Sequence, residues 1–315
     1  MMGKLRLNLQ FFAGNNIEYA TLIQNELDKA AIQDSCTGWM ESNAGQVKYN
    51  GGNEVKIPIL TTQGLADYKR AGNAGFTTGD VNFQYKTYTM EQDRGRKFGI
   101  DKNDVDETGF VLTASNIMGE FQRSWVIPEL DAYRLSKLAT IASGAGMAEA
   151  GYTPAKDSIL EKIKLGIKTI RQNGYNGPLV MHITYDALME LELYMAGKLS
   201  AQTFSAGGFN TTCPTIDGVP MIVTPENRMY TAITLNDGTT SGQEVGGYAK
   251  GVDAKEINFI IAARTTPLAI SKQDDLRIFD PSINQAFSGW AMDYRRYHDL
   301  WVKDQQKKTL WVNTK

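Results

Sequence analysis

The sequence predicts an α+β fold that contains one long β-hairpin, and two observations carry this prediction. Segments with the helical spacing of apolar residues and segments with strand-like alternation follow one another without a regular strand–helix–strand order. In addition, two alternating segments, residues 55–59 and 81–89, flank a stretch with turn-forming glycines at 64–79. An isolated two-stranded hairpin is only marginally stable in water, so a hairpin of this length needs another surface to lie on.

The composition is that of an ordinary globular protein without a basic surplus. The chain has 315 residues, 42% hydrophobic and 22% charged, enough for one large domain or two smaller ones. Its 33 basic and 35 acidic residues give a net charge of -2, whereas proteins that grip nucleic acid are usually basic. Cys36 and Cys213 belong to no paired motif, and no apolar stretch approaches the ~18 residues of a membrane helix. The sequence therefore indicates a cytosolic origin, with neither a disulfide scaffold nor a membrane span.

The N-terminal region is predicted to be an arm followed by a helix. Residues 1–13 contain basic and alternating apolar residues, but Asn8 and Gln10 interrupt the apolar stretch that a signal peptide needs. Such a segment cannot stay folded alone, so we expect it to dock on a neighbouring molecule; an edge strand of its own domain is the alternative. Residues 15–34 show the helical spacing of apolar residues, with asparagines available as a cap.

The middle of the chain is predicted to contain two long helices. Residues 109–143 form the longest helical pattern, in which Pro128 is expected to cause a kink or a break and to begin a second segment. Gly144 and Gly146 would end this helix. Residues 155–173 give the clearest amphipathic helix, with isoleucines on one face and basic residues pointing away from it.

The second half of the chain mixes strands, a helix and two long loops. Residues 198–214 and 236–251 are rich in small polar residues and predict loops, which in an assembly would face a symmetry axis or the solvent. Further elements are predicted at 179–184 (strand), 185–196 (helix), 219–224 and 230–235 (strands) and from residue 257 onward (strands). The end of the chain is dense in aromatic residues.

The sequence lacks the motifs of common catalytic, metal and cofactor sites. His182 stands in a predicted buried strand and is interpreted as a core histidine with a satisfied hydrogen bond. His298 could pair with Asp299 in a catalytic relay, but no nucleophile motif supports this. The acidic stretch 101–107 fails the calcium-loop pattern at three positions, and no zinc motif or phosphate-binding loop is present. We therefore expect no catalytic residue, metal or cofactor.

Two groups of opposite charge are candidates for contacts between molecules. One is the basic cluster at 94–97. It could contact nucleic acid or an acidic surface of a neighbour, or it could be a solvated strand face. The other is the stretch 101–107, which contains four acids and one lysine; opposite charges of this kind suit contacts that fix the register of subunits. The candidate inter-subunit contacts are Leu7, Leu9, Phe11, Phe12, Lys69, Arg70, Arg94, Arg96, Lys97, Asp104, Asp106 and Glu107.

Several short motifs, in their order along the chain, resemble the major capsid proteins of tailed bacteriophages. They are K-L-R-L-N-L-Q-F-F-A (4–13), I-N-F-I-I-A (257–262), A-I-S-K (269–272), D-L-R-I-F-D-P (275–281), G-W-A-M-D-Y-R-R-Y-H-D-L-W-V (289–302) and K-K-T-L-W-V-N (307–313). The first is similar to the start of many capsid proteins from phages of Gram-positive bacteria, and the others to the closing peripheral-domain region. The resemblance implies the HK-ninety-seven-like capsid fold, which herpesvirus shells and encapsulins share.

The resemblance also implies a layout of the chain. It assigns residues 1–44 to an N-terminal arm and helix, 45–100 to the extended loop, and 101–154 to the spine helix and the first part of the peripheral domain. Residues 155–255 would form the axial domain and 256–315 the closing part of the peripheral domain.

The implied function is structural, not enzymatic. The chain would form pentamers and hexamers of an icosahedral head that encloses double-stranded DNA, which it contacts weakly. A separate scaffolding protein, a portal and decoration proteins would be partners, with no membrane. Assembly would take place in the bacterial cytoplasm, and the product would be the capsid of the virion.

Two departures from the family pattern and two alternatives accompany this interpretation. Only about forty residues precede the hairpin, so a separate scaffolding protein and no extensive trimming of the N-terminus are expected. Lys69 lies in the hairpin tip, but no Lys–Asn–Glu set is identifiable, so no covalent crosslink is predicted. The alternatives are an encapsulin-like compartment, which would enclose an enzyme instead of DNA, and an enzyme with an atypical site, which would be a monomer or a small oligomer.

Overall fold

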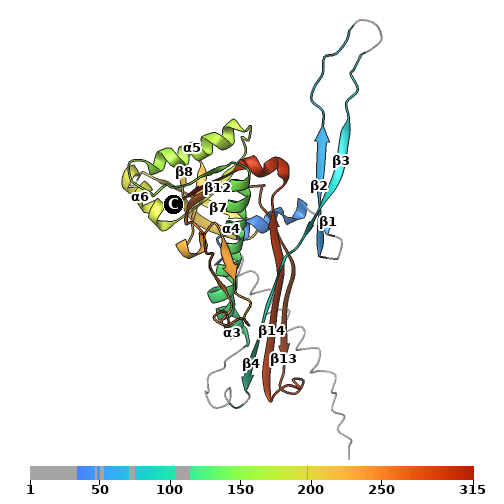
Figure 1. Ribbon diagram of the computed structural model, residues 1–315, viewed down its shortest axis with the longest axis vertical. Coiled ribbons are helices and arrows are strands. Elements are labelled where there is room, and N and C mark those ends of the chain that lie inside the picture. Colours follow the sequence, from blue (N-terminus) through green and yellow to red (C-terminus); the bar gives the residue numbers. More distant parts are fainter. Residues whose placement is uncertain are drawn as a thin grey trace, which may run out of the picture. The chain divides into compact units, whose positions relative to one another are not determined.

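The computed structural model describes residues 34–46, 48–49, 53–70, 75–101, 103, 114–196 and 198–315 (Figure 1). The chain divides into two compact units: Ala44–Glu91, here called the hairpin unit, and Met1–Asn43 with Gln92–Lys315, here called the main unit. The predicted arm and residues 15–33 of the predicted first helix lie outside the described residues. The first described element is a 3-10 helix, η1 (Gly38–Gln46).

The hairpin unit is an antiparallel sheet of three strands in the order β1-β2-β3. Its strands are β1 (Lys48–Tyr49), β2 (Glu54–Thr62) and β3 (Val81–Thr89). Figure 1 shows β2 and β3 as a long ribbon that leads into an extended tip. The predicted pair of alternating strands is therefore confirmed, because side chains of period two match the pleat of both strands.

The hairpin ends before residue 100, so the predicted extent of 45–100 is too long at its C-terminal end. Gln92–Asp101 forms β4, which pairs in the main unit with β14 (Gly289–Trp301). β13 (Leu268–Phe279) pairs with the other edge of β14. Phe98 of β4 lies opposite Met292 and packs in an apolar cluster of the main unit, and this burial accounts for the position of β4.

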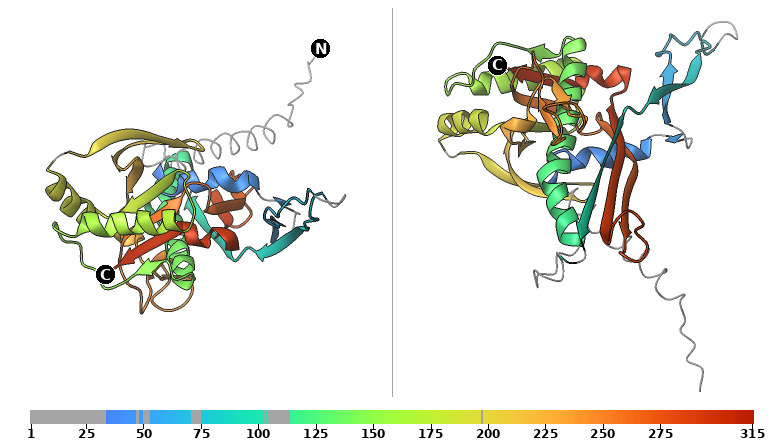
Figure 2. Two further views of the ribbon diagram at one scale, coloured as in Figure 1. Left: turned by 90° about the horizontal axis from the view of Figure 1, so that it is seen from above. Right: turned by 60° about the horizontal axis from the view of Figure 1, so that its bottom comes forward.

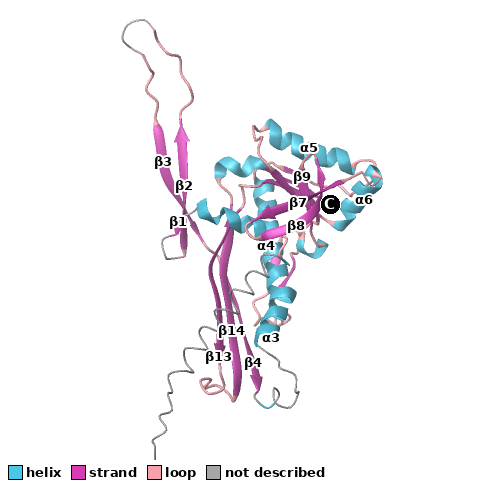
Figure 3. Cartoon of the chain, turned by 180° about the vertical axis from the view of Figure 1, so that it is seen from behind, coloured by secondary structure: helices cyan, strands magenta, loops and turns pink. Residues whose placement is uncertain are grey.

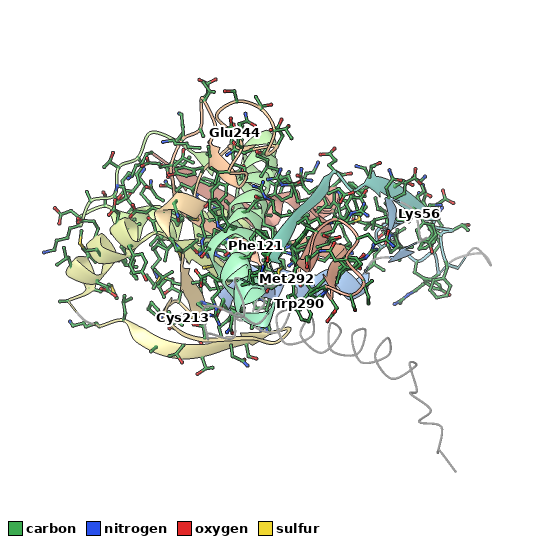
Figure 4. The ribbon with its side chains drawn as sticks, turned by 90° about the horizontal axis from the view of Figure 1, so that it is seen from below. Lys56, Phe121, Cys213, Glu244, Trp290 and Met292 are labelled. Carbon is green, nitrogen blue, oxygen red and sulfur yellow. The ribbon has the colours of Figure 1, made fainter. Side chains whose placement is uncertain are left out.

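A continuous helical segment of three parts packs against the three-stranded sheet β13-β14-β4. The parts are α3 (Ala114–Phe121), the π-helical turn η2 (Gln122–Val126) and α4 (Ile127–Gly144). Phe121 and Met292, both labelled in Figure 4, belong to the apolar cluster between this segment and the sheet.

Pro128 begins the second segment, as predicted, but it does not break the helix. It stands in the first turn of α4, and the backbone keeps right-handed helical angles from Phe121 to Ile127. The Ile127 N–H donates to the carbonyl of Gln122, five residues earlier, which is the π-helical pattern. This wider turn directly precedes the proline, which has no N–H to donate to the carbonyls of the turn before it.

The centre of the main unit is a mixed seven-stranded sheet in the order β5-β15-β12-β6-β9-β8-β7. β6 and β12 are buried at every position, as expected for central strands. β12 pairs with β6 on one side and β15 on the other, so a division of the chain at residue 255 cuts through this sheet. The strands are β5 (Ala148–Glu149), β6 (Leu179–Ile183), β7 (Ser200–Ala206), β8 (Phe209–Ile216), β9 (Val219–Val223), β12 (Ile257–Ala263) and β15 (Leu310–Thr314).

Two helices cover one face of the seven-stranded sheet (Figures 2 and 3). α5 (Ile159–Gln172) packs where Gly166 leaves room for Trp311 and Ile261, since a Cβ at this glycine would lie 2.5 Å from the indole. α6 (Tyr185–Met195) follows β6 and contacts α5. Both helices are predicted from their spacing and are confirmed.

The other face of the sheet is covered by α4 and by residues 35–43. His182 of β6 points to this side, because it accepts a hydrogen bond from the Trp39 indole at 3.1 Å. Trp39 contacts Phe204 of β7 edge to face, and Phe204 contacts Phe209 of β8 in the same way. These aromatic side chains close the large apolar core of the main unit.

Residues 198–214 are not a loop, contrary to the prediction, because β7 and β8 form a second hairpin there. Gly207 and Gly208 both have positive φ and make its tight two-residue turn. The predicted loop that begins at residue 236 is present as far as 247 and ends at β11. The remaining elements are β10 (Ile233–Leu235), which pairs with β11 (Tyr248–Lys250), and the 3-10 helices η3 (Glu226–Arg228) and η4 (Asp304–Thr309).

Candidate functional site

One face of the hairpin formed by β2 and β3 is apolar and exposed. The register places Leu60 directly opposite Phe83, and Pro58 opposite Tyr85, so alternate residues of both strands share this face. Leu60 is 56% exposed, Phe83 54% and Val81 69%. The rings of Phe83 and Tyr85 meet edge to face with centroids 5.0 Å apart. The apolar hairpin face is the set of these five side chains: Pro58, Leu60, Val81, Phe83 and Tyr85.

The opposite face of the same hairpin carries both polar and apolar side chains. Asn82 and Gln84 of β3 lie opposite Thr61 and Ile59 of β2, and both are exposed. Val55 and Ile57 of β2 stand on this same face and are fully buried. The exposed apolar side chains of β2 and β3 therefore lie on the face that contains Leu60 and Phe83.

The hairpin tip carries further exposed apolar residues together with the predicted contacts Lys69 and Arg70. Tyr68 and Phe76 stack edge to face at 4.9 Å, although Phe76 is 88% exposed. The Lys69 N–H donates to the carbonyl of Gly75 at 3.1 Å, which closes the described part of the tip. Lys69 and Arg70 are both exposed.

The contact prediction from the sequence named only charged residues of the hairpin and missed the apolar ones. The alternation of Val81, Phe83 and Tyr85 was a visible signal, but the partner residues on β2 follow only from the register. Exposed apolar side chains that lie together on a soluble protein usually mark an interaction surface. In addition, β3 is an edge strand of the sheet β1-β2-β3 in the described part of the chain, and edge strands are where a strand of another molecule can extend a sheet.

Arg94 of the predicted basic cluster has an internal structural role. Its guanidinium forms a bidentate ion pair with the carboxylate of Glu129 in α4, with N–O distances of 2.8 and 3.1 Å. It also donates to the carbonyls of Asn236 and Gly247, at 2.8 and 3.2 Å. Arg94 therefore ties β4 to α4 and to the loop 236–247 within the main unit.

Arg96 and Lys97 stand on opposite faces of β4. Arg96 donates to the carbonyl of Glu244 at 3.2 Å and, with Trp125, lines a cavity of about 400 Å³ beside the loop 236–247. Lys97 is exposed on the other side of the sheet, opposite Asp293 in register. The structure therefore separates the three basic residues into different environments.

The remaining predicted contacts lie outside the described residues, and the proposed pairing of basic and acidic groups stays a prediction. These residues are Leu7, Leu9, Phe11, Phe12, Asp104, Asp106 and Glu107.

Solved structures of phage capsids share the architecture of this chain. A structure from Mycobacterium phage Che8 matches with 15% identity and a TM-score of 0.54, covering 83% of this chain and 84% of the other. The asymmetric unit of the mature capsid of bacteriophage PhiM1 matches with 11% identity and a TM-score of 0.55, covering 84% and 82%. The capsid of Cyanophage P-SCSP1u matches with 11% identity and the same TM-score, covering 85% and 84%. No protein-family model matches the chain, and no curated protein sequence does.

This chain has the fold of a tailed-phage major capsid protein. The α+β, HK-ninety-seven-like class that the sequence predicts is thereby confirmed. The sequence identities to these structures are only 11–15%, so the resemblance seen in the sequence rests on short motifs and not on overall similarity.

Within this capsid fold, a buried carboxylate fastens residues 35–37 to α4. Asp131 is fully buried and accepts hydrogen bonds from the Ser35 and Thr37 hydroxyls, both at 2.6 Å, and from the Cys36 and Thr37 N–H groups. The Arg228 guanidinium forms an ion pair with the Asp131 carboxylate, with Nη1 and Oδ2 2.8 Å apart. Burial, with Asp131 nearby, raises the pKa of the Cys36 thiol to about 12, so this cysteine is not a reactive thiolate.

A second buried ionic group joins η1 to α4 and to β14 of the capsid fold. Glu41 accepts from Arg134 at 2.5 Å and from Arg296 at 3.1 Å. Burial alone would raise the pKa of Glu41, but the two guanidinium groups outweigh it and hold this pKa below its ordinary value. Together with Asp131, this group fastens residues 35–41 to α4 and β14.

The two histidines are structural in the described part of the capsid fold. His182 accepts from Trp39 and shares a hydrogen bond with Thr224 at 3.1 Å, and burial lowers its pKa to about 4. The interpretation as a satisfied core histidine is confirmed. His298 and Asp299 form no relay, because adjacent residues of β14 point to opposite faces and Asp299 instead accepts from Lys137 and Tyr133.

The described residues offer no metal site and no membrane-spanning helix. They contain no group of three or more His, Cys, Asp or Glu side chains placed to hold a metal ion. None of the described helices is long and apolar enough to cross a membrane.

Proposed function

We propose that this chain is a structural subunit of a tailed-phage head, a major capsid protein that self-assembles into a closed shell. The phage-capsid fold, which extends over more than 80% of the chain, carries this proposal. The apolar hairpin face supports it, because a second copy that covers this face would bury the exposed side chains of Leu60, Val81 and Phe83.

The mechanism of assembly follows from the geometry of the hairpin. Each copy would lay its apolar hairpin face over one neighbour, while its N-terminal arm, residues 1–13, would dock on another. A standard protein interface buries about 1,600 Å² in total. Each copy would form several such interfaces, and their combined free energy would stabilise the shell even where each interface alone is weak. Pentamers and hexamers of one sequence would provide the closed icosahedral symmetry.

The role would be structural and not enzymatic. Capsid structures are the neighbours of this chain, and both of its histidines are held in the core rather than in a catalytic arrangement. The net charge of -2 suits an inner surface that meets packaged double-stranded DNA without gripping it. A separate scaffolding protein, a portal and decoration proteins would complete the particle, which would assemble in the bacterial cytoplasm.

The domain layout would follow the two sheets of the main unit. The seven-stranded sheet with α5 and α6 would form most of the axial domain, and the three-stranded sheet with α3 and α4 the peripheral domain. The hairpin unit would be the extended loop. Because β12 and β15 belong to the seven-stranded sheet, the axial part would include them.

Electron microscopy and sedimentation velocity of the full chain test this function. We expect rings or closed shells from the intact chain. Deletion of residues 64–79, which removes the hairpin tip, should leave a folded subunit that forms no stable shells. A monomer at every concentration would contradict the proposed function, and normal shells from the deletion variant would contradict the role of the hairpin.

A further inference from the structure

The outer side of α6 is an uncovered apolar stripe. Tyr185, Met189 and Leu193 recur every four residues and therefore share one side of the helix. They are 63%, 52% and 54% exposed, whereas the inner side of the helix is buried against the sheet. In Figures 1 and 3, α6 lies at the rim of the main unit beside α5. Nothing in the described part of the chain covers this stripe.

The same helix is acidic. It contains Asp186, Glu190 and Glu192 and no basic residue. Asp186 lies 3.5 Å from Lys315, but Glu190 and Glu192 form no ion pair with any residue that the structure describes. The apolar stripe of α6 therefore has acidic residues beside it that form no ion pair within the described residues.

The neighbouring helix α5 has the complementary charge. It contains four basic residues and one acidic residue, and its outer side carries Leu165, which is 37% exposed, between Lys164 and Lys168. Lys164 is paired with Asp217. Lys168 is exposed and makes no ion pair within the described residues. The outer side of α5 thus combines an apolar centre with free positive charge.

We propose that α6 of one copy packs against α5 of a second copy, with Met189 and Leu193 on Leu165 and with Glu192 near Lys168. This rests on the proposed function, since it names one contact by which the copies hold together. A second copy is the favoured occupant because both halves of the contact, of opposite charge, lie on the same chain. Opposite charges around an apolar centre set the register of such a contact and speed association.

A charge-swap experiment tests the proposal on the full chain. The variants are Glu192→Lys, Lys168→Glu and the double variant that combines them. Each single reversal should raise the concentration of free subunit in equilibrium with assembled particles about tenfold, measured by sedimentation velocity, because it sets like charges together. The double variant should return this concentration to within about twofold of the original, because the pair is restored with reversed sign.

Lys156→Glu is the matched control, because Lys156 is exposed, precedes α5 and forms no ion pair within the described residues. It should assemble as the original chain does, and circular dichroism should show that all variants fold. If the original chain assembles and neither single reversal changes the free concentration, this contact is refuted while the capsid function stands. If the single variants fail and the double variant fails equally, the pairing of α6 with α5 is refuted. If the original chain forms no assembly at all, both the function and the contact are overturned.

Discussion

The apolar hairpin face gives the sharpest quantitative prediction about assembly. Replacing Leu60 and Phe83 by serine removes the two side chains that lie directly opposite each other on this face. They are 56% and 54% exposed in the single chain. Full burial of a Leu or Phe side chain contributes about 1.5–3 kcal/mol, so covering the exposed half of each contributes about 1 kcal/mol. The double variant should therefore weaken each hairpin contact by about 2 kcal/mol.

This loss corresponds to an increase of about 30-fold in the concentration of free subunit that coexists with particles. Analytical ultracentrifugation over a concentration series measures it. The main unit should keep its free energy of unfolding within about 0.5 kcal/mol, because both replaced side chains belong to the hairpin unit. Asn82→Ser with Gln84→Ser is the matched control, because these two exposed polar side chains stand on the opposite face of β3, and it should assemble as the original chain does. Equal free concentrations for the Leu60 and Phe83 variant and the original chain would refute the reasoning.

Two further predictions concern the main unit. Asp131→Ala should lower the free energy of unfolding of the main unit by about 3 kcal/mol, because Arg228 and two hydroxyls lose their buried acceptor. Urea denaturation measures this loss, and a loss below about 1 kcal/mol would contradict the role of Asp131. The pKa of His182 falls from about 6.5 in the unfolded chain to about 4 in the fold, so between these values the unfolded state binds more protons. Stability should therefore decrease by on the order of 3 kcal/mol as the pH falls through this window, and His182→Gln should remove this part of the pH dependence; an unchanged slope in the variant would show that His182 is not its source.

Local periodicity was sufficient to predict many of the strands and helices. β2, β3 and α5 were each predicted from the spacing of their own apolar residues, because apolar and polar residues alternate with the period of each element. The turn of the β7–β8 hairpin also had a visible signal in Gly207-Gly208. Its strands were predicted as a loop, because serine and threonine are frequent in them and two glycines lie between them.

Features that depend on distant pairing could not be predicted from the sequence. β4 was assigned to the hairpin because its true partner, β14, lies about two hundred residues later in the chain. The Asp131 group joins Ser35 and Arg228 from segments on either side of it that are each about a hundred residues away. Arg94 looked like an exposed contact residue because Glu129 and the loop carbonyls that engage it are invisible to local pattern. In the candidate site, the alternation predicted the strands, but only the register revealed the shared apolar face.

Cryo-electron microscopy of particles assembled from the full chain tests most directly whether another copy covers the hairpin, because a reconstruction shows what lies over Leu60, Val81 and Phe83. We expect a closed shell in which a neighbouring copy covers these three side chains. A shell that leaves them in contact with solvent, or a chain that stays monomeric with the hairpin uncovered, would contradict the proposed assembly.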